Sequence, residues 1–200
     1  LVFFANVSDN VSIGGSIGNV YRNAPNVITT FSIIMTLFGL LFAAAFFNNS
    51  ALRDHKNNFQ EIIFSKPIDK FGYFMGKFSA SLLLSTIPLT GVFFAVIIGS
   101  KIAPLMGWIE PERYGPLYLQ TFVSNYFIFI LPNMFIGGAI IYSLAQQFKN
   151  TTVSFVGAML ILVGYSIAGE LTSDIDNEKI AALVDTFGIG TYNITSKYYT

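Results

Sequence analysis

Four long stretches of this 200-residue chain contain no Asp, Glu, His, Lys or Arg, and they constrain its fold more than any other feature. They cover residues 27–47, 78–100, 115–148 and 151–169. A helix needs about 20 residues, each rising ~1.5 Å, to cross a hydrocarbon core ~30 Å thick. The first, second and fourth stretches therefore predict single membrane spans. We expect one all-α domain, a polytopic transmembrane helical bundle.

The third stretch is too long for one straight span. Its simplest interpretation is an interfacial segment over 118–126, continuing into a span that is kinked near Pro132 and loosened at Gly137 and Gly138. A re-entrant pair of half-spans is the less favoured alternative. The expected span is thus about 118–147, and residues 170–200 form a tail beyond the last span.

The composition supports a membrane protein and excludes other classes. Charged residues make up 11% of the chain, against about 25% in soluble domains. Eleven basic and eleven acidic residues balance, so nucleic acid is not an expected partner. The absence of cysteine excludes disulfides and thiolate metal sites. Because the chain opens on an apolar run at 1–5 without Met, we expect it to be a fragment that begins at the end of an upstream span.

The basic residues predict the orientation of the spans. Five of the eleven lie in the connection 48–77: Arg53, Lys56, Lys66, Lys70 and Lys77. Basic residues concentrate in cytoplasmic loops, so this connection is expected in the cytoplasm. Alternation then places the turn at Lys149 on the same side, and the connection 101–114 and the tail 170–200 on the extracytoplasmic side.

A short amphipathic helix is expected within the connection 48–77. Asn49 and Ser50 are suitable N-caps. Apolar residues follow at helical spacing: Leu52, Phe59, Ile62 and Ile63. The helix should run for about four turns and end at Lys66-Pro67, after which Asp69 caps the next helix. Such a surface helix suits docking onto a partner or lying along the lipid headgroups.

No catalytic or cofactor-binding pattern is present. His55 is the one histidine and has no metal-ligand spacing around it. Ion-coupled carriers use intramembrane carboxylates or histidines, which these spans lack. Uncharged polar residues do enter the spans, and they either join helices by hydrogen bonds or line a path for a substrate. Gly72, Gly76 and Ala80 follow a small-xxx-small pattern that lets a neighbouring helix approach.

Several segments carry a likeness to a known family. They are Arg22-Asn23-Ala24-Pro25, Ala51-Leu52-Arg53-Asp54, Ile63-Phe64-Ser65-Lys66-Pro67-Ile68, Tyr73-Phe74-Met75-Gly76-Lys77-Phe78, Leu131-Pro132-Asn133-Met134-Phe135 and the stretches 183–188 and 195–200. They resemble the permease subunits of type-2 ABC exporters, in particular the bacterial branch that is often fused to a membrane-anchored aminopeptidase. The likeness covers most of the chain from Arg22 onward.

The resemblance implies a six-span permease half in the bacterial inner membrane, paired with a second permease copy within the lipid bilayer. The loop helix would contact a separate cytoplasmic ABC ATPase, which would bind ATP and magnesium, while this chain would bind no cofactor and catalyse no reaction. The expected ATPase contacts are Arg53, Asp54, Phe59 and Glu61, and Pro67 and Gly76 would set the loop geometry. A non-transporting scaffold, anchoring an extracytoplasmic enzyme, is the alternative.

Overall fold

The computed structural model describes residues 1–11, 13, 20–173 and 185–196, and within these ranges it contains helices and no strand. The elements are α1 (Val2–Val7), α2 (Pro25–Lys56), α3 (Gln60–Phe64), α4 (Lys70–Leu105), the 3₁₀ turn η1 (Pro111–Arg113), α5 (Leu119–Asn125), the π-helical η2 (Tyr126–Ile130), α6 (Leu131–Phe148), α7 (Thr151–Ser173) and α9 (Ile189–Ser196). Four helical runs in the described chain are long and apolar enough to cross a membrane. The predicted all-α, multi-pass class is confirmed.

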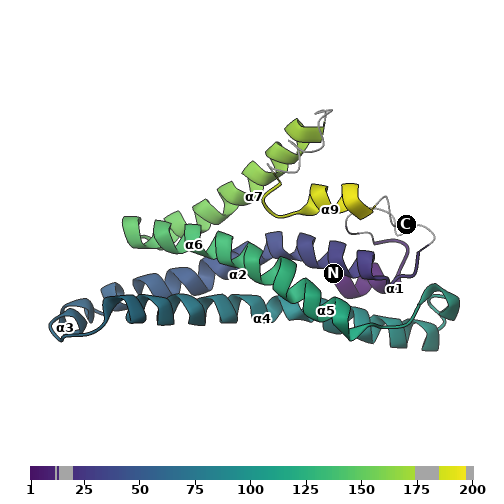
Figure 1. The fold of residues 1–200 in the computed structure, drawn as a ribbon, viewed down its shortest axis with the longest axis horizontal. Coiled ribbons are helices and arrows are strands. Elements are labelled where there is room, and N and C mark those ends of the chain that lie inside the picture. The colour runs from purple at the N-terminus through teal and green to yellow at the C-terminus, as the bar shows by residue number, and fades with distance from the viewer. Residues whose placement is uncertain (12, 14–19, 174–184, 197–200) are drawn as a thin grey trace.

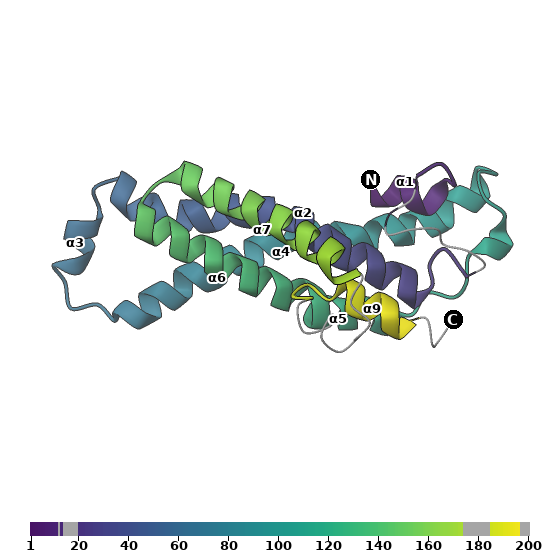
Figure 2. The same cartoon turned by 90° about the horizontal axis from the view of Figure 1, so that it is seen from above.

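Helices α2, α4 and α6 lie side by side and form an elongated bundle (Figure 1). Short α3 closes one end, where it bridges α2 and α4 (Figure 2), and we call this the α3 end. Helices α1 and α9 lie toward the opposite end, the α1 end. The α6–α7 turn is at the α3 end, since Lys56 Nζ donates to Thr151 Oγ1 at 2.8 Å. The two connections predicted to share a side therefore do so.

Helix α2 is the centre of the bundle and contacts α4, α6 and α7. Its most apolar window is 61% buried within the protein, whereas that of α7 is 17% buried. Figure 1 shows the reason, because α7 inclines away from the other long helices. Most of the α7 surface therefore faces outward, where a lipid environment suits its apolar side chains.

The third apolar stretch forms one helical run over Leu119–Phe148. Because this run is continuous, it does not form a re-entrant pair, and the interfacial position of 118–126 stays a prediction. Its irregularity is the π-helical segment Tyr126–Ile130, just before Pro132. Proline has no amide hydrogen and its ring collides with the carbonyl one turn earlier, so a widened turn accommodates it without breaking the helix. A π-helical segment thus stands where a kink was expected, and the kink itself stays a prediction.

Gly137 and Gly138 do not loosen the span, contrary to the expectation. They are sites of close helix contact, since a Cβ atom at Gly137 would collide with the Leu40 side chain and one at Gly138 with the Phe47 ring. Leu40 and Phe47 belong to α2 and are both fully buried. The two glycines therefore let α6 approach α2 closely, as small residues do between membrane helices.

The prediction of a four-turn amphipathic helix is also wrong. Asn49 and Ser50 lie inside α2, which continues to Lys56, because Leu52 extends its buried face and is only 1% exposed. The helix ends where Asn58 adopts a positive φ of 55°, a conformation that Asn tolerates better than most residues. Only the five-residue α3 follows.

The predicted cap of the next helix is confirmed. The Asp69 carboxylate accepts hydrogen bonds from the backbone N–H groups of Phe71 at 3.0 Å and Gly72 at 2.9 Å.

Polar residues within the spans join helices to one another. Asn133 Nδ2 donates to Thr36 Oγ1 at 3.3 Å, linking α6 to α2. Thr86 Oγ1 lies 3.0 Å from the Tyr126 hydroxyl, linking α4 to η2. These contacts favour the structural interpretation of the two left open, because a buried polar side chain is stabilised only when it has a partner.

The predicted tail 170–200 is partly helical. Helix α7 continues to Ser173, while residues 174–184 and 197–200 lie outside the described residues. The segment before α9 returns to the bundle, because Asn133 Nδ2 also donates to the Phe187 carbonyl at 3.0 Å.

Arg22, which precedes α2, connects α1 to the bundle by hydrogen bonds. Its side chain is 2% exposed, and its guanidinium donates to the carbonyls of Ala5 at 3.3 Å, Asn6 at 3.2 Å and Ser8 at 3.2 Å. It also pairs with Asp9. The last carbonyls of a helix lack partners within the helix and carry partial negative charge, so a buried cation at this point satisfies both needs. Burial lowers the pKa of Arg22, but an arginine remains charged at neutral pH.

Candidate functional site

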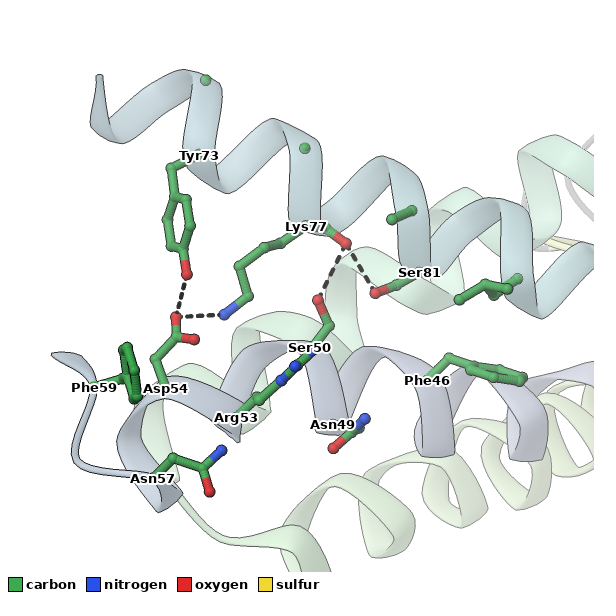
Figure 3. Close-up of a pocket in the computed structure, with 14 residues that line it drawn as sticks. Phe46, Asn49, Ser50, Arg53, Asp54, Asn57, Phe59, Tyr73, Lys77 and Ser81 are labelled. Atoms are coloured by element: carbon green, nitrogen blue, oxygen red, sulfur yellow. Dashed lines mark hydrogen bonds and ion pairs between the residues drawn. The ribbon is translucent and has the colours of Figure 1, made fainter. Parts of the chain in front are cut away.

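A cavity of about 770 Å³ opens at the α3 end, between the last turns of α2 and the first turns of α4 (Figure 3). Gly72, Gly76 and Ala80 line its α4 wall. Residues four apart share a helix face, so three small side chains in this register leave space. Nothing lies within 4 Å of a Cβ placed at Gly76. Within this chain, the small-residue pattern therefore makes a hollow and not the predicted close helix contact.

A polar cluster crosses the cavity and joins its two walls. Asp54 Oδ2 accepts from the Tyr73 hydroxyl at 2.6 Å and from Lys77 Nζ at 2.7 Å. Lys77 Nζ also lies 5.3 Å from the centre of the Tyr73 ring. Figure 3 shows these side chains pointing toward one another from α2 and α4. The carboxylate expected to meet a partner is therefore occupied within the chain, where it connects the two longest helices.

We expect Asp54 and Lys77 to be energetically coupled. Their side chains are 20% and 17% exposed, so their ion pair should exceed the ~0.2–1 kcal/mol of fully exposed pairs. In a double-mutant cycle with Asp54→Ala and Lys77→Met, we predict a coupling free energy of about 1–2 kcal/mol. Unfolding in detergent measures it, and a parallel cycle on Lys66 and Glu61, both exposed, is the control. Equal coupling in the two cycles would contradict this assignment.

The other predicted contact residues are exposed around the cavity. Arg53 and Phe59 line it, and Phe59 is 54% exposed. Glu61 lies on α3 and is exposed. The structure thus brings Arg53, Asp54 and Phe59 to one cavity and places Glu61 on the adjoining helix.

The two residues assigned to loop geometry have different positions. Pro67 lies in the exposed connection between α3 and α4. Gly76 lies within α4, so it shapes the cavity wall instead of the loop.

Tyr73 and Lys77 were missed as site residues. The sequence marks Tyr73 as an interfacial aromatic residue and Lys77 as a basic residue of the connection, but nothing in their spacing identifies Asp54 as their partner. The sequence does contain a signal: one acid, Asp54, lies near the end of the first span, and a Tyr-xxx-Lys pair lies at the start of the second span. Tyr73 and Lys77 are four residues apart and so share a face of α4.

The charge at this end of the bundle is asymmetric. Residues 48–77 and 148–150 contain six basic and three acidic side chains, a net charge of +3.

In the part of the chain that the structure describes, no group of three or more His, Cys, Asp or Glu residues is placed to hold a metal ion. Compared with family models, curated proteins and solved structures, the chain has no significant match.

Proposed function

We propose that this chain is the membrane-spanning permease subunit of a type-2 ABC exporter in a bacterial inner membrane, coupling ATP hydrolysis on a separate subunit to substrate movement. The resemblance of its loop and span segments to that family supports this proposal. In it, the α3 end faces the cytoplasm, in agreement with the concentration of basic residues there. A second permease copy completes the transporter, and the ATPase binds ATP and magnesium.

The observation that carries the proposal is the exposed α3 between the two longest helices. Phe59 is 54% exposed and Ile62 is 57% exposed, and they present an apolar surface beyond the ends of the spans. Exposed aromatic and aliphatic side chains at a bundle end are typical of a docking surface. Because Asp54 and Lys77 tie α2 to α4, a displacement of α3 reaches both helices.

The direct test is reconstitution of the transporter from its native membrane with Arg53 and Glu61 both replaced by alanine. If these residues meet the ATPase, substrate-stimulated ATP hydrolysis falls at least about tenfold, which corresponds to ~1.4 kcal/mol of lost contact energy. Lys101→Ala with Glu112→Ala is the matched control, since it removes one exposed cation and one exposed anion at the α1 end.

A second experiment, combined with the first, decides between the permease and the scaffold. Photo-crosslinking from position 59 should capture a subunit with a nucleotide-binding loop. If that position captures no such subunit and hydrolysis is unchanged in the Arg53 and Glu61 variant, the coupling role is wrong and the scaffold interpretation takes its place.

A further inference from the structure

The cavity between α2 and α4 extends across the predicted edge of the hydrocarbon core. Its walls run from Phe46 to Asn57 on α2 and from Gly72 to Leu84 on α4, which is about three helical turns or ~17 Å. The uncharged stretch of α2 ends at residue 47, and that of α4 begins at residue 78. The edge of the core therefore passes through the cavity, which has one part inside the core and one part outside it.

The two parts of the cavity differ in polarity. The part inside the core is lined by Phe46, Ala80 and Leu84, together with Ser81, whose hydroxyl donates to the Lys77 carbonyl at 2.9 Å. Leu84 is 48% exposed, so the apolar wall is accessible from the surface of the bundle. The part outside the core is lined mainly by polar side chains: Asn49, Ser50, Arg53, Asn57 and the polar cluster around Asp54. The polarity thus changes along the cavity in the same direction as it changes along a lipid, from acyl chain to headgroup.

Arg53 carries the charge of the cavity that has no counterion. The charged lining residues are Arg53, Lys77 and Asp54, a net charge of +1. Lys77 pairs with Asp54, whereas the Arg53 side chain is exposed and forms no hydrogen bond or ion pair with a residue that the structure describes. A guanidinium presents a planar set of N–H donors that matches the oxygens of a phosphate. Arg53 is therefore the group that would bind an anionic ligand.

The Arg53 guanidinium lies at the depth of the lipid headgroups. The backbone of Arg53 is six residues beyond the uncharged stretch of α2, but side chains on a helix lean toward its N-terminus, which for α2 is the direction of the span. Figure 3 shows the guanidinium turned back along α2 toward Ser50. The level of Ser50 is three residues, or ~4.5 Å, beyond the edge of the core, and the headgroup layer extends for about 5–8 Å.

We propose that this cavity binds an anionic phospholipid, with the phosphate on Arg53 and the first part of an acyl chain along Phe46, Ala80 and Leu84. Its volume of about 770 Å³ lies within the range of ligand sites, ~300–1,000 Å³. A soluble phosphate compound would leave the apolar part of the cavity unfilled, and a cytoplasmic protein would reach only the part outside the core. A phospholipid fills both parts and is retained by its acyl chains as well as by charge. The proposal concerns the chain alone in lipid and is independent of the proposed transport function.

The test is native mass spectrometry of the full chain, equilibrated with equal amounts of phosphatidylglycerol and phosphatidylcholine in detergent. Wild-type protein should retain phosphatidylglycerol preferentially. One cation beside an anionic lipid contributes roughly a fivefold effect, so Arg53→Gln should weaken that preference by about fivefold. Lys66→Gln is the matched control, because it removes the same charge from an exposed residue of the same connection that does not line the cavity. It should change the preference by less than about twofold, since exposed charges at a distance are screened.

A second pair of variants tests the cavity without changing any charge. Gly76→Leu places a side chain in the cavity, because Gly76 lines it and nothing lies within 4 Å of a Cβ atom there. This variant should lose the retained lipid. Gly91→Leu is the control, since Gly91 also lies on α4 with nothing within 4 Å of its Cβ position but does not line the cavity. It should retain phosphatidylglycerol as the wild type does.

Three results would overturn the proposal. Equal losses in Arg53→Gln and Lys66→Gln would mean diffuse attraction of anionic lipid to a basic surface. Unchanged lipid retention in Gly76→Leu would place the bound lipid outside this cavity. Displacement of the lipid by excess glycerol phosphate would assign the cavity to a soluble phosphate compound.

Discussion

Replacing Arg22 by glutamine should destabilise the protein by about 3 kcal/mol. The substitution removes the cation that serves the carbonyls of Ala5, Asn6 and Ser8, and the Arg22 side chain that supplies it is only 2% exposed. A buried acceptor that loses its donor forfeits its solvation without compensation. Unfolding in a detergent mixture, followed by circular dichroism, measures the loss.

Asp9→Asn is the matched control for Arg22. The Asp9 side chain is 79% exposed, so its ion pair with Arg22 is screened by solvent and should contribute less than about 1 kcal/mol. The contrast separates the two functions that the guanidinium serves, because its contacts to the Ala5 and Asn6 carbonyls are buried whereas Asp9 is exposed. If the two variants lose similar amounts of stability, the stabilisation comes from the ion pair with Asp9 and not from the contacts to the carbonyls at the end of α1.

Replacing Gly138 by alanine should have an effect of similar size, about 2–3 kcal/mol of destabilisation. The new methyl group would collide with the Phe47 ring. This ring cannot swing away, because it packs against Phe78 and Tyr142 with ring centres 5.1 Å and 6.3 Å apart. The strain must therefore separate α6 from α2. The same detergent unfolding experiment measures the loss.

Gly76→Ala is the control for the glycine prediction. It adds the same methyl group to a helix position with nothing within 4 Å. Alanine is the better helix former by about 0.5–1 kcal/mol, so this variant should be neutral or slightly more stable than the wild type. If Gly76→Ala destabilises as much as Gly138→Ala does, the cost comes from losing glycine itself and not from helix contact.

The two glycine positions show where sequence reasoning stops. Runs without charge predicted all four spans correctly, because a membrane tolerates few alternatives to an apolar helix. The sequence predicts close helix contact at Gly76 and a loosened helix at Gly138, but the structure shows the opposite: Gly76 borders open space, and Gly138 is a point of close helix approach. Spacing along one helix does not reveal which helix lies opposite it, so contact partners needed the tertiary structure.

The end of α2 was mispredicted for a related reason. Asn49 and Ser50 favour N-caps locally, but burial of Leu52 against the core stabilises a continuous helix and overrides that preference. At the candidate site, the structure brings Arg53, Asp54 and Phe59 to one cavity, while their contact with an ATPase stays a prediction. Their grouping around one cavity, and the bonds from Tyr73 and Lys77 to Asp54, depend on α2 and α4 lying together.

The continuity of α2 has a mechanical consequence. Its 32 residues form an uninterrupted rod of about 48 Å at ~1.5 Å per residue. A tilt of about 10° around its middle moves each end by about 4 Å in opposite directions. Helix α4 is more compliant, because Pro88 interrupts its hydrogen-bond ladder part-way along. Helices α2 and α4 thus combine a rigid helix with a more flexible one, and the ion pair between Asp54 and Lys77 joins them at one end.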